Sequence, residues 1–509
     1  MLSIKNKKMK KSKYILSSLV AVFLLLASSC ENVLDLEPIS QIPDSKFWKT
    51  NADAELGVIA IYDAMQSTYR VKHFLWGDFR SDNYVSSTQP NADTESLILN
   101  QLDPEQSDYA SWGDLYRMIF RANLAIAKIP EIPLYNKNLL GEAYALRAYA
   151  YFDAYRIWGG VPLFKDAALT FDESSFKARS TAKEVLDLAL ADLAEAEKLI
   201  NSQSGPNATR FSVGAMLAFK AKVLMFLNKP AEANIVLQEL IDTKLYSLTI
   251  DRTSWGDLFL NDIAFPDRGQ KGTELIMSLR YEQAEDGNRA SGVYQLHFPG
   301  VPGYWISPKV QQKWVQKFPT NELSWSEKYP GVPPPIKDVD PITGLPLIYG
   351  DYRYYETITQ VGSVQDLRVS KYAKTNYSPR DDDTNIVLFR YADMLLLKAE
   401  AENQLDNPQG AVDLLDRVRV ARGLPKVNSG TFPDIVNIND KAALENFILD
   451  ERQLELFAEG TRWWDLVRTG KAVEVMGPIN GQTEARITWP IYFIHLIDNP
   501  KLEQNEAYK

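Results

Sequence analysis

Residues 213–237 read VGAMLAFKAKVLMFLNKPAEANIVL, and residues 391–415 read YADMLLLKAEAENQLDNPQGAVDLL. Six of the residues that the two stretches share at a constant offset of 178 positions define the pattern. These are Lys220, Ala221, Leu227, Pro230, Ala233 and Leu237 in the first copy, and Lys398, Ala399, Leu405, Pro408, Ala411 and Leu415 in the second. Proline is tolerated at the start of a helix because the N–H there has no partner within the helix. Each copy therefore predicts a helix, a tight turn and a second helix that begins near the proline.

An antiparallel helix pair of this kind is typical of a tetratricopeptide (TPR) unit. A third, split copy is predicted from the alanine- and aromatic-rich residues 142–158 and the amphipathic residues 181–200, which Gly159-Gly160-Val161-Pro162 separates. Residues 442–467 predict a further helical stretch that closes the stack. TPR stacks usually present a surface to another protein, so the repeat indicates a partner rather than a reaction.

Residues 243–385 interrupt the repeats. They hold 12 of the 27 prolines and 11 of the 26 glycines and show no sustained helical period. We therefore expect a mainly α fold, in which TPR-like helix pairs at about 142–242 and 387–467 form a superhelical scaffold. A large irregular insertion at about 243–385 completes a single domain over residues 44–509.

The N-terminus carries a secretory leader over residues 1–29. Lysines precede an apolar run from Ile15 to Ala27, which is shorter than the roughly 20 residues of a spanning helix. Ala27-Ser28-Ser29 then leads to the only cysteine, Cys30, which resembles the lipobox of a bacterial lipoprotein. We expect cleavage there, acylation of Cys30 and a lipid-anchored tether at 30–43, with an ordinary signal peptide as the alternative.

Composition excludes several classes of function. Without the six lysines of the leader, 50 basic residues face 66 acidic ones, a net charge of −16 that argues against nucleic acid as a partner. Three histidines and one cysteine supply few ligands for a zinc site. The motifs HExxH, GxSxG, GxxxxGK and GxGxxG are absent from the sequence, so no cofactor is indicated.

Two windows combine aromatic rings with polar groups, as a sugar-binding surface requires. The candidate ligand-binding residues in these windows are Trp76, Asp78, Arg80 and Asn83, followed by Tyr294, Tyr304, Trp305 and Trp314. The alternative is that these rings belong to the core, because a chain with 11 Trp and 25 Tyr must bury many of them.

Two acidic clusters allow a chemical and a structural interpretation. Glu451, Glu455 and Glu459 follow a helical spacing and could act as acids, but we expect Arg452, Arg462 and Arg468 to pair with this acidic block and lock helices together. Residues 381–383 are three aspartates that could bind calcium. They lack the spacing of an EF-hand loop, and an acidic segment that precedes a helix is the structural interpretation.

Several segments together resemble the SusD/RagB family of Bacteroidetes outer-membrane nutrient-binding lipoproteins. The matching segments are 30–35 (CENVLD) with Pro38, 146–149 (LRAY), 160–163 (GVPL), 389–393 (FRYAD), 399–401 (AEA), 417–419 (RVR), the block 451–466 (ERQLELFAEGTRWWDL), 489–491 (WPI) and 499–505 (NPKLEQN). The resemblance implies a helical TPR side and an irregular side whose loops bind ligand. It also implies a partner, a SusC-like TonB-dependent transporter in the outer membrane, and a position at the cell surface.

The function expected from this resemblance is capture of a nutrient oligomer, most readily an oligosaccharide, and its delivery to the transporter without bond cleavage. A peptide-binding member of the same family is the nearest alternative. A secreted glycoside hydrolase, or a pure interaction scaffold without a small ligand, are alternatives from other classes.

Overall fold

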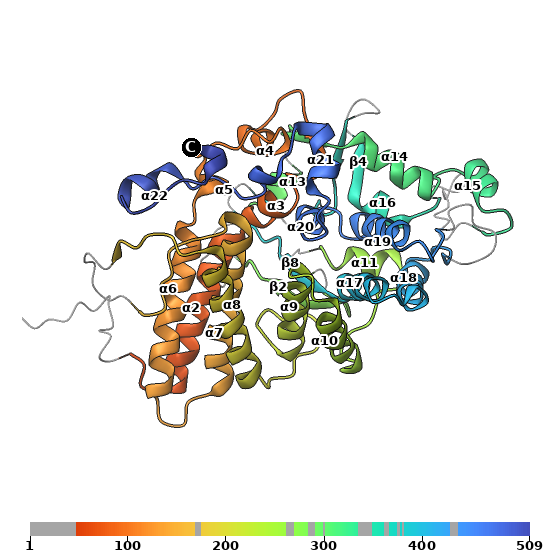
Figure 1. The fold of residues 1–509 in the computed structure, drawn as a ribbon. Coiled ribbons are helices and arrows are strands. Elements are labelled where there is room, and N and C mark those ends of the chain that lie inside the picture. The colour runs from red at the N-terminus through yellow and green to blue at the C-terminus, as the bar shows by residue number, and fades with distance from the viewer. Residues whose placement is uncertain are drawn as a thin grey trace, which may run out of the picture.

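The computed structural model describes residues 47–167, 175–260, 269–282, 291–298, 301–333, 349–360, 366–373, 377–378, 381–427 and 436–509 (Figure 1). The predicted leader, Cys30 and the tether at 30–43 lie outside the described residues. Among the described residues, no helix is both long and apolar enough to cross a membrane.

Long helices pack in pairs and form one side of the molecule, along the lower part of Figure 1. The pairs are α2 (Asn51–Tyr69) with α6 (Gly113–Lys128), α7 (Lys137–Trp158) with α8 (Ala182–Leu199), α9 (Val213–Phe226) with α10 (Pro230–Asp242), and α17 (Tyr391–Gln404) with α18 (Pro408–Ala421). Neighbouring pairs also contact one another, through α6 with α7, α8 with α9 and α10 with α17. The prediction of a mainly α fold is confirmed, and the antiparallel helix pairs are consistent with TPR-like units.

The repeat read from the sequence is also present in the backbone. Helices α17 and α18 begin 178 residues after α9 and α10, and Pro230 and Pro408 occupy the first helical turn in the two copies. The turn residues Asn228 and Asp406 are equivalent as well, with left-handed φ angles of 54° and 61°. The same kind of short turn therefore joins the two helices within each pair.

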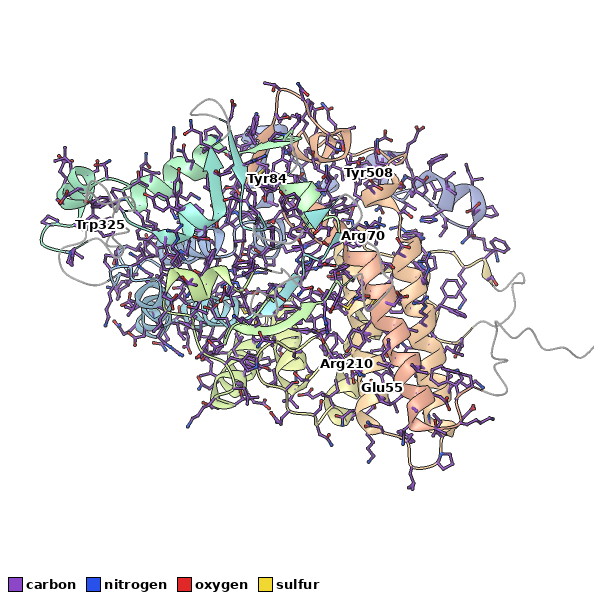
Figure 2. All side chains as sticks on the ribbon, turned by 180° about the vertical axis from the view of Figure 1, so that it is seen from behind. Glu55, Arg70, Tyr84, Arg210, Trp325 and Tyr508 are labelled. Atoms are coloured by element: carbon purple, nitrogen blue, oxygen red, sulfur yellow. The ribbon has the colours of Figure 1, made fainter. Side chains whose placement is uncertain are left out.

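The helical side begins earlier than the sequence predicted. Helix α7 starts at Lys137, and the pair α2 and α6 precedes it although neither helix was predicted. An ion pair of Arg210 with Glu55 links α2 to the segment before α9, and Figure 2 shows the two side chains beside each other. Arg210 also contacts Glu142 of α7 at 2.8 Å, so its guanidinium links α2, α7 and the segment before α9.

The predicted helical stretch at 442–467 is broken in the structure. Helix α19 (Lys441–Glu455) ends before a turn at 456–461, and α20 (Arg462–Arg468) follows that turn. Within the turn, Ala458 and Gly460 have φ angles of 59° and 70°, which an α-helix does not allow. The Tyr372 hydroxyl donates to the Ala458 carbonyl oxygen at 2.7 Å and helps to hold the turn.

Short elements make up the irregular side. Its helices are α3 (Lys72–Gly77), α4 (Ala92–Ile98), α5 (Ser107–Ala110), α11 (Arg252–Gly256), α13 (Val293–His297), α14 (Pro308–Lys317), α15 (Glu322–Lys328), α16 (Tyr352–Thr357), α21 (Ala472–Asn480) and α22 (Phe493–Asp498). They lie above the helix pairs in Figure 1.

Antiparallel two-stranded sheets complete this side. They pair β1 (Tyr84–Ser86) with β3 (Tyr304–Ile306), β2 (Leu275–Leu279) with β8 (Ile386–Arg390), β4 (Ile358–Gln360) with β5 (Leu367–Val369), and β6 (Tyr377–Ser378) with β7 (Asp381–Asp382). Strand β8 leads directly into α17, so the pair β2 and β8 attaches the insertion to the helical scaffold.

Candidate functional site

An open groove of about 530 Å³ lies on the irregular side, where α3, the start of α4, α5, α13 and β3 meet. Its lining combines aliphatic side chains with amides and carboxyls: Val71, Leu75, Gln89, Pro90, Asn91, Asp93, Thr94, Asp108, Gly292, Gln295, Leu296, Val301, Gly303 and Tyr304. Apolar contact area beside directed hydrogen-bonding groups is the combination that small-ligand sites use.

Asn91 shapes one wall of this groove. Its side-chain oxygen accepts hydrogen bonds from the backbone N–H groups of Asp93 and Thr94, at 3.0 and 3.3 Å, and so caps α4. Its own N–H donates to the Gly303 carbonyl at 3.3 Å. A Cβ atom on Gly303 would lie 2.9 Å from the Asn91 Cβ, so only glycine allows the two segments to approach this closely.

Two carboxyl groups from different helices meet in the groove. Burial and the neighbouring Asp108 carboxyl raise the pKa of Asp93 to about 6. A raised pKa is expected where two carboxyls compete for one proton. The pair can therefore both accept and donate hydrogen bonds near neutral pH, and both functions suit a ligand rich in hydroxyl or amide groups.

The first aromatic window forms core rather than a surface. Trp76, Asp78, Arg80 and Asn83 are each at most 2% exposed. The Trp76 indole donates to the Tyr109 carbonyl at 2.9 Å, and the Arg80 guanidinium lies 4.4 Å from the Trp463 ring. Their hydrogen-bonding and stacking capacity is used within the fold.

Asp78 fastens this window to the turn at 456–461. It accepts hydrogen bonds from the backbone N–H groups of Gly460, at 2.7 Å, and Arg462, at 3.3 Å. Burial nevertheless raises the pKa of Asp78 to about 7.

The second window divides into buried and accessible residues. Trp314 is fully buried and donates to Asp351 at 2.9 Å, and Tyr304 is 3% exposed with its hydroxyl 2.6 Å from His297 Nδ1. Tyr294 on α13 and Trp305 on β3 are half-buried. Of the predicted ligand-binding residues, only Tyr304 lines the groove, while Tyr294 directly precedes the lining residue Gln295. The assignment of ligand contacts to the two windows stays a prediction.

The acidic block serves the framework. Glu451 and Glu455 lie on α19, but Glu459 lies beyond its end, so the expectation of one helix face holds for two of the three glutamates. All three contact buried cations: Glu451 contacts Lys317, Arg353 and Arg419, Glu455 contacts Arg353, Arg390 and Arg422, and Glu459 contacts Lys371 and Arg390.

The predicted partners of these glutamates were wrong. Arg452 pairs with Asp393 and Asp465, Arg462 with Asp82, and Arg468 with Glu400 and Asp465. The cations that surround the glutamates come from segments distant in sequence, which the spacing within the block could not reveal. Ion pairing, and not acid catalysis, is what these contacts support.

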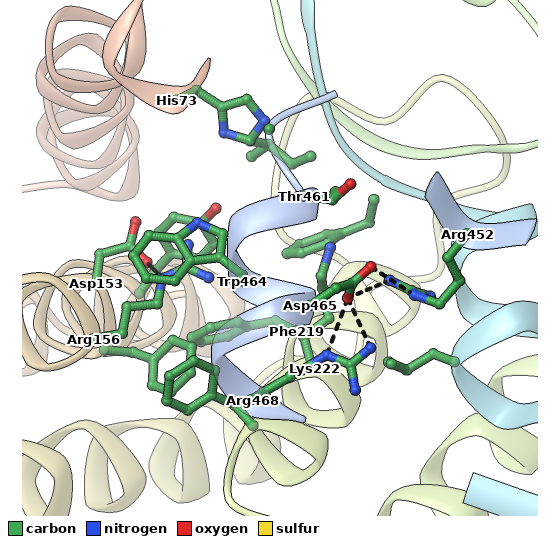
Figure 3. Close-up of a pocket in the computed structure, with 17 residues that line it drawn as sticks. His73, Asp153, Arg156, Phe219, Lys222, Arg452, Thr461, Trp464, Asp465 and Arg468 are labelled. Carbon is green, nitrogen blue, oxygen red and sulfur yellow. Dashed lines mark hydrogen bonds and ion pairs between the residues drawn. The ribbon is translucent and has the colours of Figure 1, made fainter. Parts of the chain in front are cut away.

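A second cavity of about 50 Å³ lies between α7, α9 and α20 (Figure 3). Arg156 stacks over the Trp464 ring at 4.1 Å, and Arg468 and Arg452 contact Asp465, as the dashed lines in Figure 3 show. Its volume accommodates only a few water molecules. The chain's own α20 occupies this part of the helical side, so the cavity has no room for an oligomer.

Of the three aspartates at 381–383, Asp382 has a structural role. Asp382 is buried and its carboxylate accepts hydrogen bonds from Thr384 and from the backbone N–H of Tyr294. Within the part of the chain that the structure describes, no group of three or more His, Cys, Asp or Glu side chains could hold a metal ion.

Most groove residues were not predicted from the sequence. Asn91, followed by Asp93 and Glu95, carries a helix-start signal, but that signal indicates structure and not ligand binding. Gln89 and Asp108 stand in ordinary polar segments, and Gln295 lies between Tyr294 and Leu296 in an apolar and aromatic stretch. Only the tertiary fold brings them together.

Comparison with known proteins places the chain in a family. The SusD family profile matches residues 349–508, and a profile described as starch-binding, associating with the outer membrane, matches residues 34–225. SusD-like protein P38 of Formosa agariphila is 59% identical over 98% of this chain and 100% of its own length.

Solved structures share the fold. A SusD superfamily protein from Bacteroides thetaiotaomicron has a TM-score of 0.66 at 23% identity, over 91% of this chain and 99% of its own. A laminarin-binding SusD-like protein has a TM-score of 0.63 at 23% identity, over 90% of this chain and 100% of its own. By sequence and by fold, the chain belongs to the SusD/RagB family.

Proposed function

We propose that this protein is a cell-surface lipoprotein that binds a nutrient oligomer, in the first place an oligosaccharide, in the groove between α4 and α13. It then delivers the oligomer to a SusC-like TonB-dependent transporter in the outer membrane. Cys30 anchors the protein through its acyl chains, and the cargo is not cleaved.

The open groove is the observation that carries this proposal. Aliphatic side chains such as Leu75 and Leu296 suit the C–H surface of a sugar, while the amides of Asn91 and Gln295 suit its hydroxyl groups. The half-buried ring of Tyr294 belongs to α13, beside the lining residue Gln295, and can extend the contact surface.

Two further observations support the role. One of the structural relatives is named as laminarin-binding, and one matching profile is described as starch-binding and associating with the outer membrane. The secretory leader and the lipobox-like segment before Cys30 agree with export and anchoring.

A peptide is the second candidate cargo, and the groove gives one reason to test it. Tyr304 is the only aromatic residue among the lining residues described, and it is almost fully buried. A glycan site usually offers an open ring face, whereas aliphatic side chains and amides also fit a peptide.

Calorimetric titration of the mature protein in detergent tests the proposal. Plant, algal, fungal and host oligosaccharides and mixed peptides are titrated separately, and each mixture is then analysed for cleavage products. We expect binding to one oligosaccharide class without products. Binding of peptides alone would transfer the assignment to the second candidate, and cleavage would contradict the carrier role.

Variants of the groove locate the site. Asn91→Ala and Gln295→Ala should each raise the Kd about fivefold, because a lost hydrogen bond is worth about 1 kcal/mol. Gln409→Ala, on the exposed face of α18, is the matched control and should leave the Kd unchanged.

A further inference from the structure

We propose that Asp382 is a positioning residue for the groove, because its carboxylate holds α13 in the orientation that directs Gln295 and Leu296 toward the ligand. The inference rests on the function proposed above. Asp382 does not line the groove and acts only through the backbone of α13.

Asp382 accepts four hydrogen bonds, two of which join its segment to the start of α13. Its Oδ2 accepts from the Tyr294 N–H at 2.8 Å, and its Oδ1 accepts from the N–H and the hydroxyl of Thr384, at 3.2 and 2.6 Å. Its backbone carbonyl accepts from the Ser291 N–H at 2.7 Å. The residue is 1% exposed, so these bonds are shielded from water.

Helix α13 depends on such an external partner. It has only five residues, too few for a helix to be stable alone, and its N-cap is Gly292, which has no side chain to accept a hydrogen bond. The Asp382 carboxylate supplies the missing acceptor and places a negative charge at the positive end of the helix.

Gly292 makes the orientation of α13 specific. Its φ angle is 78°, and a Cβ atom there would lie 3.2 Å from Val71 Cγ1 across the groove lining. The chain therefore turns sharply into α13 at a point where it already touches the opposite segment. A small shift of this turn would move Gln295 and Leu296 together.

The other side of Asp382 is firmly held. Thr384 is fully buried, and the Asn385 side-chain oxygen accepts from the Tyr281 N–H at 2.8 Å. Strand β8 follows at Ile386 and ends at Arg390, which is paired with Glu274, Glu455 and Glu459. Asp382 thus connects the groove wall to the most rigidly paired part of the core.

Hydrogen exchange and calorimetry on the full mature protein test this role. Asp382→Asn keeps the volume but replaces one acceptor with a donor, so either Tyr294 or Thr384 loses its partner. We expect exchange in residues 291–298 to accelerate about tenfold, as loss of a hydrogen bond to a charged group predicts. The Kd for the oligosaccharide that wild type binds best should rise by about the same factor.

Asp251→Asn is the matched control. Asp251 caps α11, another five-residue helix, by accepting from the Ser254 N–H at 2.9 Å, but α11 does not line the groove. This variant should accelerate hydrogen exchange in α11 and leave the Kd for the oligosaccharide unchanged. Thr384→Val is a second, milder variant that removes one donor to Asp382, and it should raise the Kd by a smaller factor.

The two readouts separate the possible failures. Unchanged exchange at 291–298 in Asp382→Asn would contradict the inference, and so would accelerated exchange with an unchanged Kd, although the proposed function would stand in both cases. A wild-type protein that binds no oligosaccharide and no peptide would contradict the proposed function itself, and the positioning role would fall with it.

Discussion

Arg353 has no exposed side-chain surface and lies among three carboxylates, those of Asp351, Glu451 and Glu455, at 2.6 to 2.9 Å. A guanidinium can donate to several carboxylates at once because its five N–H groups form a fixed fork. The residue therefore joins α16 to α19 through buried charge alone. Such a group is costly to disturb, because each remaining partner would be a buried charge without compensation.

Removing this guanidinium should destabilise the whole protein. Arg353→Ala leaves three buried carboxylates with fewer partners, and we expect the free energy of unfolding to fall by about 3 to 5 kcal/mol in urea titrations. Lys183→Ala breaks the exposed ion pair with Asp187 and should change the free energy of unfolding by less than about 0.5 kcal/mol. Equal effects of the two variants would contradict the structural role of the buried network.

The same network predicts how stability depends on pH. Burial alone would raise the pKa of Glu451, but the charges of Lys317, Arg353 and Arg419 outweigh it and hold the pKa at about 2. A depressed carboxyl pKa stabilises the folded state above the ordinary value of 4.5, and this contribution is lost as the pH falls from 4.5 toward 2.

For Glu451 the loss is on the order of 3 kcal/mol. Urea titrations at pH 5 and pH 3 should show a smaller loss of stability on acidification for Glu451→Gln than for wild type. A loss of equal size in both proteins would mean that Glu451 has no depressed pKa.

At the residue scale the sequence identified important positions, but their burial gives no support to the predicted ligand contacts, which stay a prediction. Trp76, Arg80 and Trp314 combine rings and polar groups as a sugar site does, yet the same combination also describes a core in which polar groups find internal partners. Asp93 on α4 and Gln295 on α13 gave no signal of ligand binding, because a polar residue looks the same in the sequence whether it faces a ligand or solvent.

At the scale of elements, the repeated turn shows how local chemistry sets a helix pair. Asn228 and Asp406 adopt left-handed φ angles, and asparagine and aspartate tolerate this conformation better than most residues. Two residues later a proline begins the next helix. Sequence reasoning located these two pairs because the turn and the proline recur at one fixed offset.

A β-branched residue should disturb this turn. Asn228→Val places a branched side chain at φ 54° and should lower the free energy of unfolding by about 1 kcal/mol or more, while Asn228→Gly should leave it nearly unchanged. Thermal unfolding followed by circular dichroism distinguishes the two variants. If valine is tolerated as well as glycine, the turn does not require the left-handed conformation.

The turn at 456–461 and helices α2 and α6 were not predicted from the sequence pattern. The helical period continues through the turn at 456–461, but contacts with Lys371 and Tyr372, distant in sequence, hold that turn in a non-helical conformation. Helices α2 and α6 lack a recognisable repeat partner and were missed, although the spacing of Leu115, Met118, Ile119 and Ala122 is that of an amphipathic helix.

At the scale of the whole molecule, the helix pairs lie in the lower part of Figure 1, and the helices that supply groove residues, α3, α4, α5 and α13, lie in its upper part. Binding of cargo on one side and of a transporter on the other needs no overlap between the two surfaces. The anchor at Cys30 would hold both surfaces close to the membrane through the short tether.

The proposed anchor has a direct test. Wild-type protein expressed in a Bacteroidetes host should incorporate labelled palmitate and partition into detergent, whereas Cys30→Ser should incorporate none and remain in the aqueous phase. Incorporation of label into Cys30→Ser would contradict acylation at this residue.

A hydrogen-exchange footprint tests whether the cargo binds in the groove. The mature protein is compared with and without a saturating concentration of the oligosaccharide that it binds best. We predict that the segment 89–94 and the described residues of the segment 291–304 gain protection, because both segments supply lining residues of the groove. Protection confined to the helix pairs, with exchange in both segments unchanged, would contradict binding in the groove.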